Sequence, residues 1–128
     1  MMIHLTRFDE TLAKPDSSHY FVGNVRTYML VGREQSAELE LLAVYFSAGA
    51  RNKPHIHEKD QVLHFTQGRG IVATETERRV CSAGDVVTIP GGTWHWHGAT
   101  RDEATCHISI RQPGATNWDV ELKDWSEY

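Results

Sequence analysis

The stretches HIHEKDQ (residues 55–61) and GDVVTIPGGTWHWHGA (residues 84–99) decide the fold that we expect of this chain. Each contains two histidines separated by one residue, and on a β-strand residues two apart leave by the same face. Gln61 comes four residues after His57 and shares that face if the strand continues. We therefore expect each pair, His55 with His57 and His95 with His97, to point in one direction from its strand.

The sequence around these stretches is typical of an all-β protein. Between about residues 20 and 112, short segments rich in Val, Ile, Thr and aromatic residues alternate with turn signals, and Gly68-Arg69-Gly70 is interpreted as one hairpin turn. Many short strands without helices between them predict a sandwich or barrel. We expect a single domain with this barrel at its centre and irregular extensions at both ends.

Composition excludes several classes of function. Thirteen Lys and Arg oppose seventeen Asp and Glu, so the net charge of −4 disfavours nucleic acid as a partner. The longest apolar run, Leu41 to Phe46, is too short to cross a membrane, and the first residues lack the pattern of a signal peptide. We expect a cytoplasmic protein in which Cys81 and Cys106 are reduced.

The histidines predict a metal site. His107 lies on a third predicted strand with Ser109 and Arg111 on its face, and a barrel turns the inward faces of its strands towards one cavity. Five buried imidazoles without a metal or a catalytic role would leave many polar atoms to satisfy. A transition metal bound by several of these histidines is the simplest explanation.

The spacing of these residues resembles the two sequence motifs of the cupin family. Gly49-x5-His55-Ile56-His57-x3-Gln61-x6-Gly68 resembles the first motif, and Gly84-x5-Pro90-Gly91-Gly92-x2-His95-x3-Ala99 the second. The resemblance covers roughly residues 20–112 and implies a double-stranded β-helix, or jelly-roll cupin barrel, with one mononuclear metal. Gln61 stands where the family usually has glutamate, and Ala99 where it has asparagine.

One branch of small, single-domain bacterial cupins is more similar still. HIHEKDQ, GDVVTIPGGTWHWHGAT and TCHISIRQ resemble the manganese-dependent hydroxynitrile lyases and the carboxymuconolactone-decarboxylase-associated cupins. The resemblance implies that His107 acts as acid or base and that Leu42 and Val44 line an apolar pocket. The metal ligands that it implies are His55, His57, Gln61 and His95.

The implied cofactor is one divalent transition metal. Three imidazoles and an amide oxygen suit Mn(II) first and Fe(II) second, and Zn, Ni or Co remain open. Because Gln61 is neutral, the full charge of the ion stays on the site, which favours Lewis-acid chemistry over oxygen activation.

Two residues keep alternative interpretations. His97 is either a proton relay and support for the site or a hydrogen-bonded core histidine. Arg111 either binds an anionic group of the substrate or forms an internal ion pair or part of the rim.

The sequence therefore predicts a metal-dependent lyase that acts on a small organic molecule, in which His107, aided by His97, moves a proton. An Fe(II)-dependent dioxygenase and a non-catalytic small-molecule binding or sensor protein are the alternatives. The resemblance also implies a homodimer or a higher homo-oligomer, with Trp118 and Trp125 of the tail placed against a neighbouring subunit.

Overall fold

The fold is all-β, as the sequence predicts. The computed structural model describes residues 2–125, and within that range it contains no α-helix. In chain order the elements are a 3-10 helix, η1 (Glu10–Leu12), and the strands β1 (Lys14–Pro15), β2 (Phe21–Val22), β3 (Val25–Val31), β4 (Glu40–Phe46), β5 (Arg51–Asn52), β6 (Ile56–His57), β7 (Gln61–Thr74), β8 (Arg78–Ser82), β9 (Val86–Ile89), β10 (His95–Ala99), β11 (Thr105–Arg111) and β12 (Thr116–Asn117).

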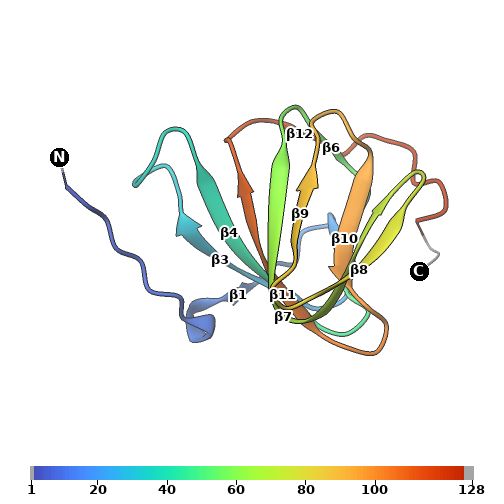
Figure 1. Cartoon of the computed structure of the whole chain (residues 1–128), viewed down its shortest axis with the longest axis horizontal. Coiled ribbons are helices and arrows are strands. Elements are labelled where there is room, and N and C mark those ends of the chain that lie inside the picture. The colour runs from blue at the N-terminus through green and yellow to red at the C-terminus, as the bar shows by residue number, and fades with distance from the viewer. Residues whose placement is uncertain (1, 126–128) are drawn as a thin grey trace.

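The long strand β7 joins the two halves of a curled antiparallel sheet (Figure 1). Its first half pairs with β9 and β11, and its second half pairs with β8 and β10. The order β1-β3-β4-β11-β7-β10-β5-β2 runs from one edge to the other. The curl turns one face of every strand inwards, so residues far apart in sequence meet inside the barrel.

The continuity of β7 corrects the predicted hairpin turn at residues 68–70. Gly68 has a φ of +67°, and the register of β11 against β7 shifts at Cys106 and His107. A side chain at Gly68 would clash with the carbonyl of Ala104. Thr66 is the extra residue of this bulge, and Gly68 stays paired with Thr105, so the segment bends one strand from the first half of the sheet into the second and does not form a turn that ends it.

Apolar side chains pack on both faces of β7 and the strands beside it. Inside, Leu63 and Phe65 pack with Val72, Cys81 and Ile89. Outside, the cluster of Ile71, Ala73, Trp94 and Trp96 is covered by Val120 and Trp125 from the tail. The two faces of β7 thus alternate between an inner and an outer apolar layer, as the period of a strand requires. Cys81 and Cys106 are buried and unpaired.

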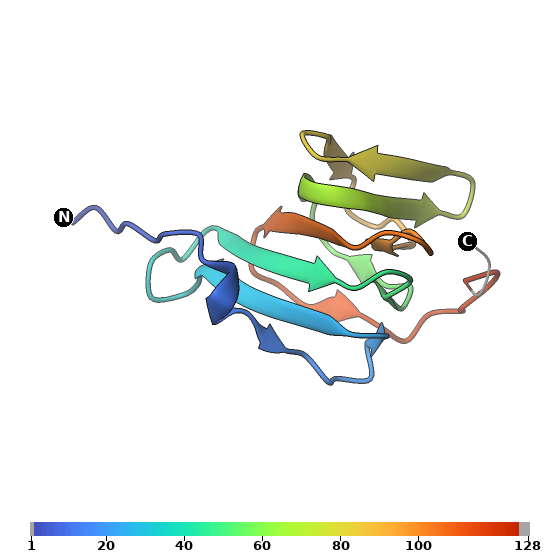
Figure 2. The same ribbon diagram turned by 90° about the horizontal axis from the view of Figure 1, so that it is seen from below.

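Both ends of the chain contribute a short strand, although the sequence predicts irregular extensions. β1 pairs with β3, and β12 pairs with β6 beside the barrel mouth. The first residues extend away from the barrel, whereas the tail folds back on it (Figures 1 and 2). Trp94 Nε1 donates to the Glu121 carbonyl at 2.7 Å, and Trp125 Nε1 to the Asn52 carbonyl at 2.9 Å. No helix in residues 2–125 is long and apolar enough to cross a membrane.

Candidate metal centre

Three imidazoles meet at the barrel mouth, and we call them the outer cluster: His55, His57 and His95. His55 forms a β-bridge with His95, and His57 follows on β6. The ring centroids lie 4.3 Å apart for His55 and His95, 4.8 Å for His55 and His57, and 5.3 Å for His57 and His95. All three side chains are buried. The structure therefore brings together one member of the second H-x-H pair and both members of the first.

Backbone carbonyls fix the orientation of two of these rings. Nδ1 of His55 donates to the Lys53 carbonyl at 2.7 Å, and Nδ1 of His95 donates to the Thr93 carbonyl at 2.8 Å. Because a carbonyl only accepts, each Nδ1 carries the proton and each Nε2 keeps a lone pair. Metal-binding histidines are ordinarily held in this way.

The remaining donor atoms fit a bound cation. Nε2 of His57 is buried and has no hydrogen-bond partner within the described chain. Gln61 donates its amide to Ser109 Oγ at 2.8 Å, which turns its Oε1 to within 3.1 Å of Nε2 of His95. Two lone pairs that face each other repel unless a cation lies between them. His55, His57, His95 and Gln61 therefore have the donor chemistry that a divalent metal requires.

Gln61 reaches this position for a reason other than the one its spacing suggests. The strand of His57 ends there, residues 58–59 form a bend, and Gln61 begins β7 opposite Ile89 and Arg111. The side chain therefore faces the outer cluster because a new strand enters the barrel, not because β6 continues.

His97 and His107 form an inner pair behind the outer cluster. Nε2 of His107 lies 3.0 Å from Nδ1 of His97, and the amide nitrogen of Asn52 lies 3.2 Å from both ring nitrogens of His97. The Asn52 oxygen accepts from the backbone N–H of His97 at 2.9 Å. Phe46 and Phe65 pack against His107 at 5.3 Å between centroids.

The two groups of histidines are in contact. Ligand atoms of His55, His95 and His97 lie within 4.8 Å of one another, so His97 is close enough to the outer cluster to bind the same ion. Nδ1 of His97, however, already has Nε2 of His107 as a hydrogen-bond partner, whereas Nε2 of His57 has no partner in residues 2–125. We retain His57 in the predicted ligand set for that reason.

Burial keeps all five imidazoles neutral. It lowers the pKa of His57 to about 4, with a further contribution from His95, and burial also lowers the pKa of His107 to about 4. Burial lowers the pKa of His55, His95 and His97 as well. Neutral imidazole is the form that binds a metal or accepts a proton.

A cavity of about 120 Å³ opens over both groups of histidines. Its apolar wall includes Leu42 and Val44 together with Phe21, Phe46 and Trp118. This volume is slightly below that of an engineered apolar cavity that holds benzene, roughly 150 Å³. The pocket is therefore on the scale of one small ring or a short aliphatic chain.

The tail supplies pocket residues that the sequence analysis did not identify. Trp118 lies over His55 at 4.2 Å between centroids and stacks on Tyr20 at 4.3 Å. Trp118 and Trp125 thus pack on their own chain, and the contact with a neighbouring subunit stays a prediction. The signal available in the sequence was an aromatic residue in a polar tail, which does not indicate the surface it covers.

Arg111 combines two of the predicted interpretations. It lines the pocket, and its Nε forms an ion pair with Glu40 Oε1 at 3.4 Å, directly opposite it on β4. Its Nη1 lies 3.5 Å from the Gly114 carbonyl and 3.4 Å from Nδ1 of His57. The guanidinium is therefore held at the pocket rim by partners of its own chain.

Comparison with known proteins identifies the fold family. The sequence model of the cupin-domain family matches residues 42–110, more than half of the chain. The chain is a cupin. A cupin-like protein from Thermotoga maritima has a solved structure that superimposes with a TM-score of 0.79 at 34% identity, over 87% of each chain.

Two curated relatives of this cupin have enzymatic names. It is 33% identical to (R)-mandelonitrile lyase from Granulicella tundricola over 110 residues, which are 85% of this chain and 81% of the relative. It is also 33% identical to acireductone dioxygenase from a Synechococcus species over 58 residues. That second match covers only 42% of this chain and 31% of the dioxygenase.

Proposed function

We propose that this cupin is a metal-dependent lyase that cleaves a small, uncharged cyanohydrin into an aldehyde and hydrogen cyanide. The observation that carries the proposal is the convergence of three buried imidazoles, with Nε2 of His57 left without a partner in residues 2–125, beside a neutral histidine pair in one pocket. The similarity to a mandelonitrile lyase over most of both chains supports the same chemistry.

The ligands that we assign are His55, His57, His95 and Gln61. A divalent ion held there, Mn(II) by preference and Fe(II) next, would supply Lewis acidity towards a substrate oxygen. Since all four ligands are neutral, none of the charge of the ion is cancelled by the protein. The role of the four side chains is to hold that charge at the base of a pocket whose apolar wall includes Leu42 and Val44.

His107 is the base that we assign. The neutral ring has its buried Nδ1 without a partner in the described chain, and its Nε2 lies against Nδ1 of His97. We assign the neutral ring of His107, which lines the pocket, as the group that accepts the cyanohydrin hydroxyl proton. The carbon–carbon bond then breaks, its electron pair leaves with cyanide, and the proton on His107 converts cyanide into hydrogen cyanide.

The pocket favours an uncharged substrate with a compact apolar group. About 120 Å³ suits a single ring or a short aliphatic chain against Leu42 and Val44. Arg111 and Glu40 neutralise each other at the rim, so the rim contributes little net charge towards a carboxylate. Mandelonitrile, with one phenyl ring, is a substrate of the right size and charge.

The experiment that tests this proposal measures benzaldehyde release from mandelonitrile by the protein loaded with Mn(II) or Fe(II). The metal-free protein and free metal ion serve as controls for the spontaneous reaction. We expect turnover only with the loaded protein, and its loss in His107→Ala. Release no faster than in the controls with either metal would overturn the lyase assignment.

A dioxygenase is the second candidate, because the segment shared with acireductone dioxygenases is a specific observation in its favour. An oxygen electrode separates the two reactions, since cyanohydrin cleavage consumes no oxygen. Oxygen uptake by the Fe(II)-loaded protein on addition of a substrate, without aldehyde release from cyanohydrins, would assign the dioxygenase instead.

A further inference from the structure

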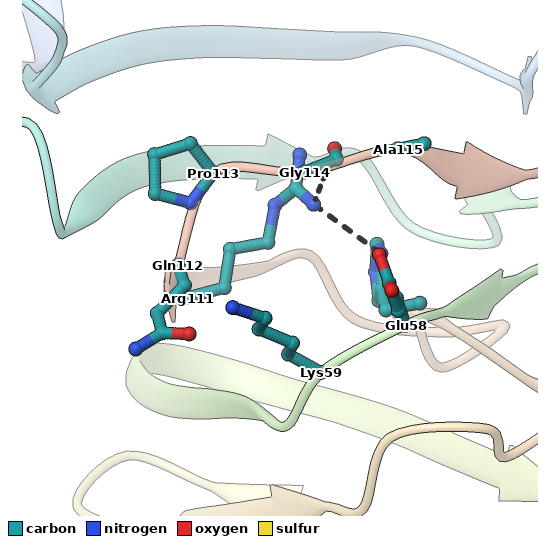
Figure 3. A pocket seen from close by; sticks show the side chains of 8 residues that line it. Glu58, Lys59, Arg111, Gln112, Pro113, Gly114 and Ala115 are labelled. Atoms are coloured by element: carbon teal, nitrogen blue, oxygen red, sulfur yellow. Dashed lines mark hydrogen bonds between the residues drawn. The ribbon is translucent and has the colours of Figure 1, made fainter.

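His57 is the only ligand of the outer cluster whose Nδ1 is not anchored by a backbone carbonyl in the described chain. Two side chains approach that atom instead: Thr116 Oγ1 at 3.1 Å and Arg111 Nη1 at 3.4 Å. Thr116 lies directly opposite His57 in the β12–β6 pair. Arg111 extends from the end of β11, and Figure 3 shows its side chain beside the segment from Gln112 to Ala115.

The two neighbours differ in what they allow the ring to do. A guanidinium N–H only donates, so a bond from Arg111 requires a lone pair on Nδ1 and places the proton of the neutral ring on Nε2. A threonine hydroxyl donates or accepts, so Thr116 is the neighbour of the two that can accept a proton from Nδ1 and so leave the lone pair on Nε2. Only the second tautomer presents Nε2 to a metal ion.

We propose that Thr116 is a positioning residue that selects the metal-binding tautomer of His57 and that Arg111 opposes it. The proposal rests on the metal site assigned under the proposed function. Arg111 has alternative acceptors in Glu40, at 3.4 Å, and the Gly114 carbonyl, at 3.5 Å, so it can leave His57 to Thr116. The tail strand β12 thereby joins the metal site without supplying a ligand.

The distance between these residues in sequence explains why no motif indicates this role. Thr116 follows His57 by 59 residues and belongs to a strand of two residues, Thr116–Asn117. A strand this short has no periodic pattern, and its pairing with β6 depends on the tail packing of Trp118 and Trp125.

The test compares wild type, Thr116→Val and Thr116→Ser. Valine keeps the shape of threonine and removes the hydroxyl, whereas serine keeps the hydroxyl. We expect Thr116→Val to bind Mn(II) about 10 to 100 times more weakly, the usual cost of losing such a partner, and Thr116→Ser to bind it nearly as wild type does. Free Mn(II) is followed by its electron paramagnetic resonance signal. Thr66→Val is the matched control, because the Thr66 hydroxyl bonds the Cys106 carbonyl.

The tautomer itself is observed in the metal-free protein. Long-range ¹H–¹⁵N spectra at neutral pH should show His57 protonated on Nδ1 in wild type and on Nε2 in Thr116→Val, with the signal assigned from its absence in His57→Gln. An unchanged tautomer in Thr116→Val overturns the proposal, even if Mn(II) binding weakens. Unchanged Mn(II) affinity in that variant also overturns it.

Arg111 provides the second arm. Adding Arg111→Leu to Thr116→Val should restore more Mn(II) affinity than Arg111→Leu adds to the wild type, because the competing donor is removed. If Arg111→Leu raises Mn(II) affinity equally in wild type and in Thr116→Val, the gain reflects only the lost positive charge. That result would overturn the proposal that Arg111 opposes Thr116. If wild type binds no Mn(II), the metal site of the proposed function fails, while the tautomer measurement still decides the role of Thr116.

Discussion

The outer cluster and the inner pair place similar residues in similar surroundings and differ in where their ring nitrogens point. All five imidazoles are buried, and burial lowers the pKa of each. In the outer cluster, Nδ1 atoms bond to the Lys53 and Thr93 carbonyls, and Nε2 of His57 has no partner in residues 2–125. In the inner pair, His97 and His107 bond to each other, and Nδ1 of His107 is the ring nitrogen left without a side-chain partner among those residues.

This difference separates two uses of buried histidine. Rings anchored on one side, with free lone pairs on the other, need a cation to compensate for lost solvation. Rings that bond each other are satisfied in large part by the protein and can pass a proton between them. The comparison thus predicts that one mutation can abolish metal binding and another can abolish proton transfer, each without the other.

The largest effect is expected from His57→Ala, which removes one ligand of the outer cluster. We expect loss of bound metal, loss of cyanohydrin cleavage, and loss of the stabilisation that metal gives, about 2.7 kcal/mol at a hundred times the dissociation constant. Elemental analysis and thermal unfolding with and without Mn(II) measure these changes.

His64→Ala is the control for that experiment, since His64 lies on β7 opposite Val86 and does not line the pocket. Wild-type metal content in His57→Ala would contradict the ligand assignment and would favour His55, His95 and His97 as the set instead.

A smaller effect is expected from His107→Ala, which breaks the inner pair. Metal content should stay at the wild-type level, while the rate of cleavage should fall by about 10² to 10⁴, the usual range for general acid–base catalysis. Elemental analysis and kcat from aldehyde release are measured on one preparation. If the variant also loses its metal, the two regions are not separable and His107 belongs to the metal site.

The sequence predicts a contact of the site well when the two residues are close along the chain and poorly when they are far apart. The two-residue spacing of His55 and His57 fixes a shared direction locally, and the cupin motif spacing correctly predicts the barrel around it. The Gly-Arg-Gly segment is ambiguous, because glycine with positive φ occurs both in a turn and in a bent continuous strand, and only the pairing of β11 with β7 distinguishes them. Thr116 and Trp118 meet the site through tail packing, for which the sequence has no local pattern.

Acid should destabilise the metal-free protein, and His107 isolates the contribution of the inner pair. Its pKa falls from 6.5 to about 4 on folding, so the unfolded chain binds more protons below pH 6.5. The contribution of neutral His107 to the free energy of unfolding is therefore present at neutral pH and is lost as pH falls towards 4. We expect about 2 kcal/mol of loss from this residue between pH 7 and 5.

Urea unfolding of wild type and His107→Gln at both values of pH measures that loss. The variant should lose about 2 kcal/mol less than wild type, because glutamine does not titrate. An identical dependence on pH in the two proteins would show that His107 is not held in the neutral form by the fold.

The smallest effect is expected from Ser109→Ala, which changes neither cluster directly. Ser109 accepts the Gln61 amide at 2.8 Å and so turns the Gln61 oxygen towards His95. Loss of one such bond costs about 0.5–1.5 kcal/mol, which corresponds to a decrease in metal affinity of up to about tenfold.

Thr105→Val is the matched control on the same strand, since the Thr105 hydroxyl donates to the Gln67 carbonyl at 2.9 Å. A decrease in Mn(II) affinity in Ser109→Ala alone assigns the orientation of Gln61 to this bond. Equal affinities in the two variants would mean that the Gln61 oxygen is not a ligand and that the outer cluster binds its ion through imidazoles.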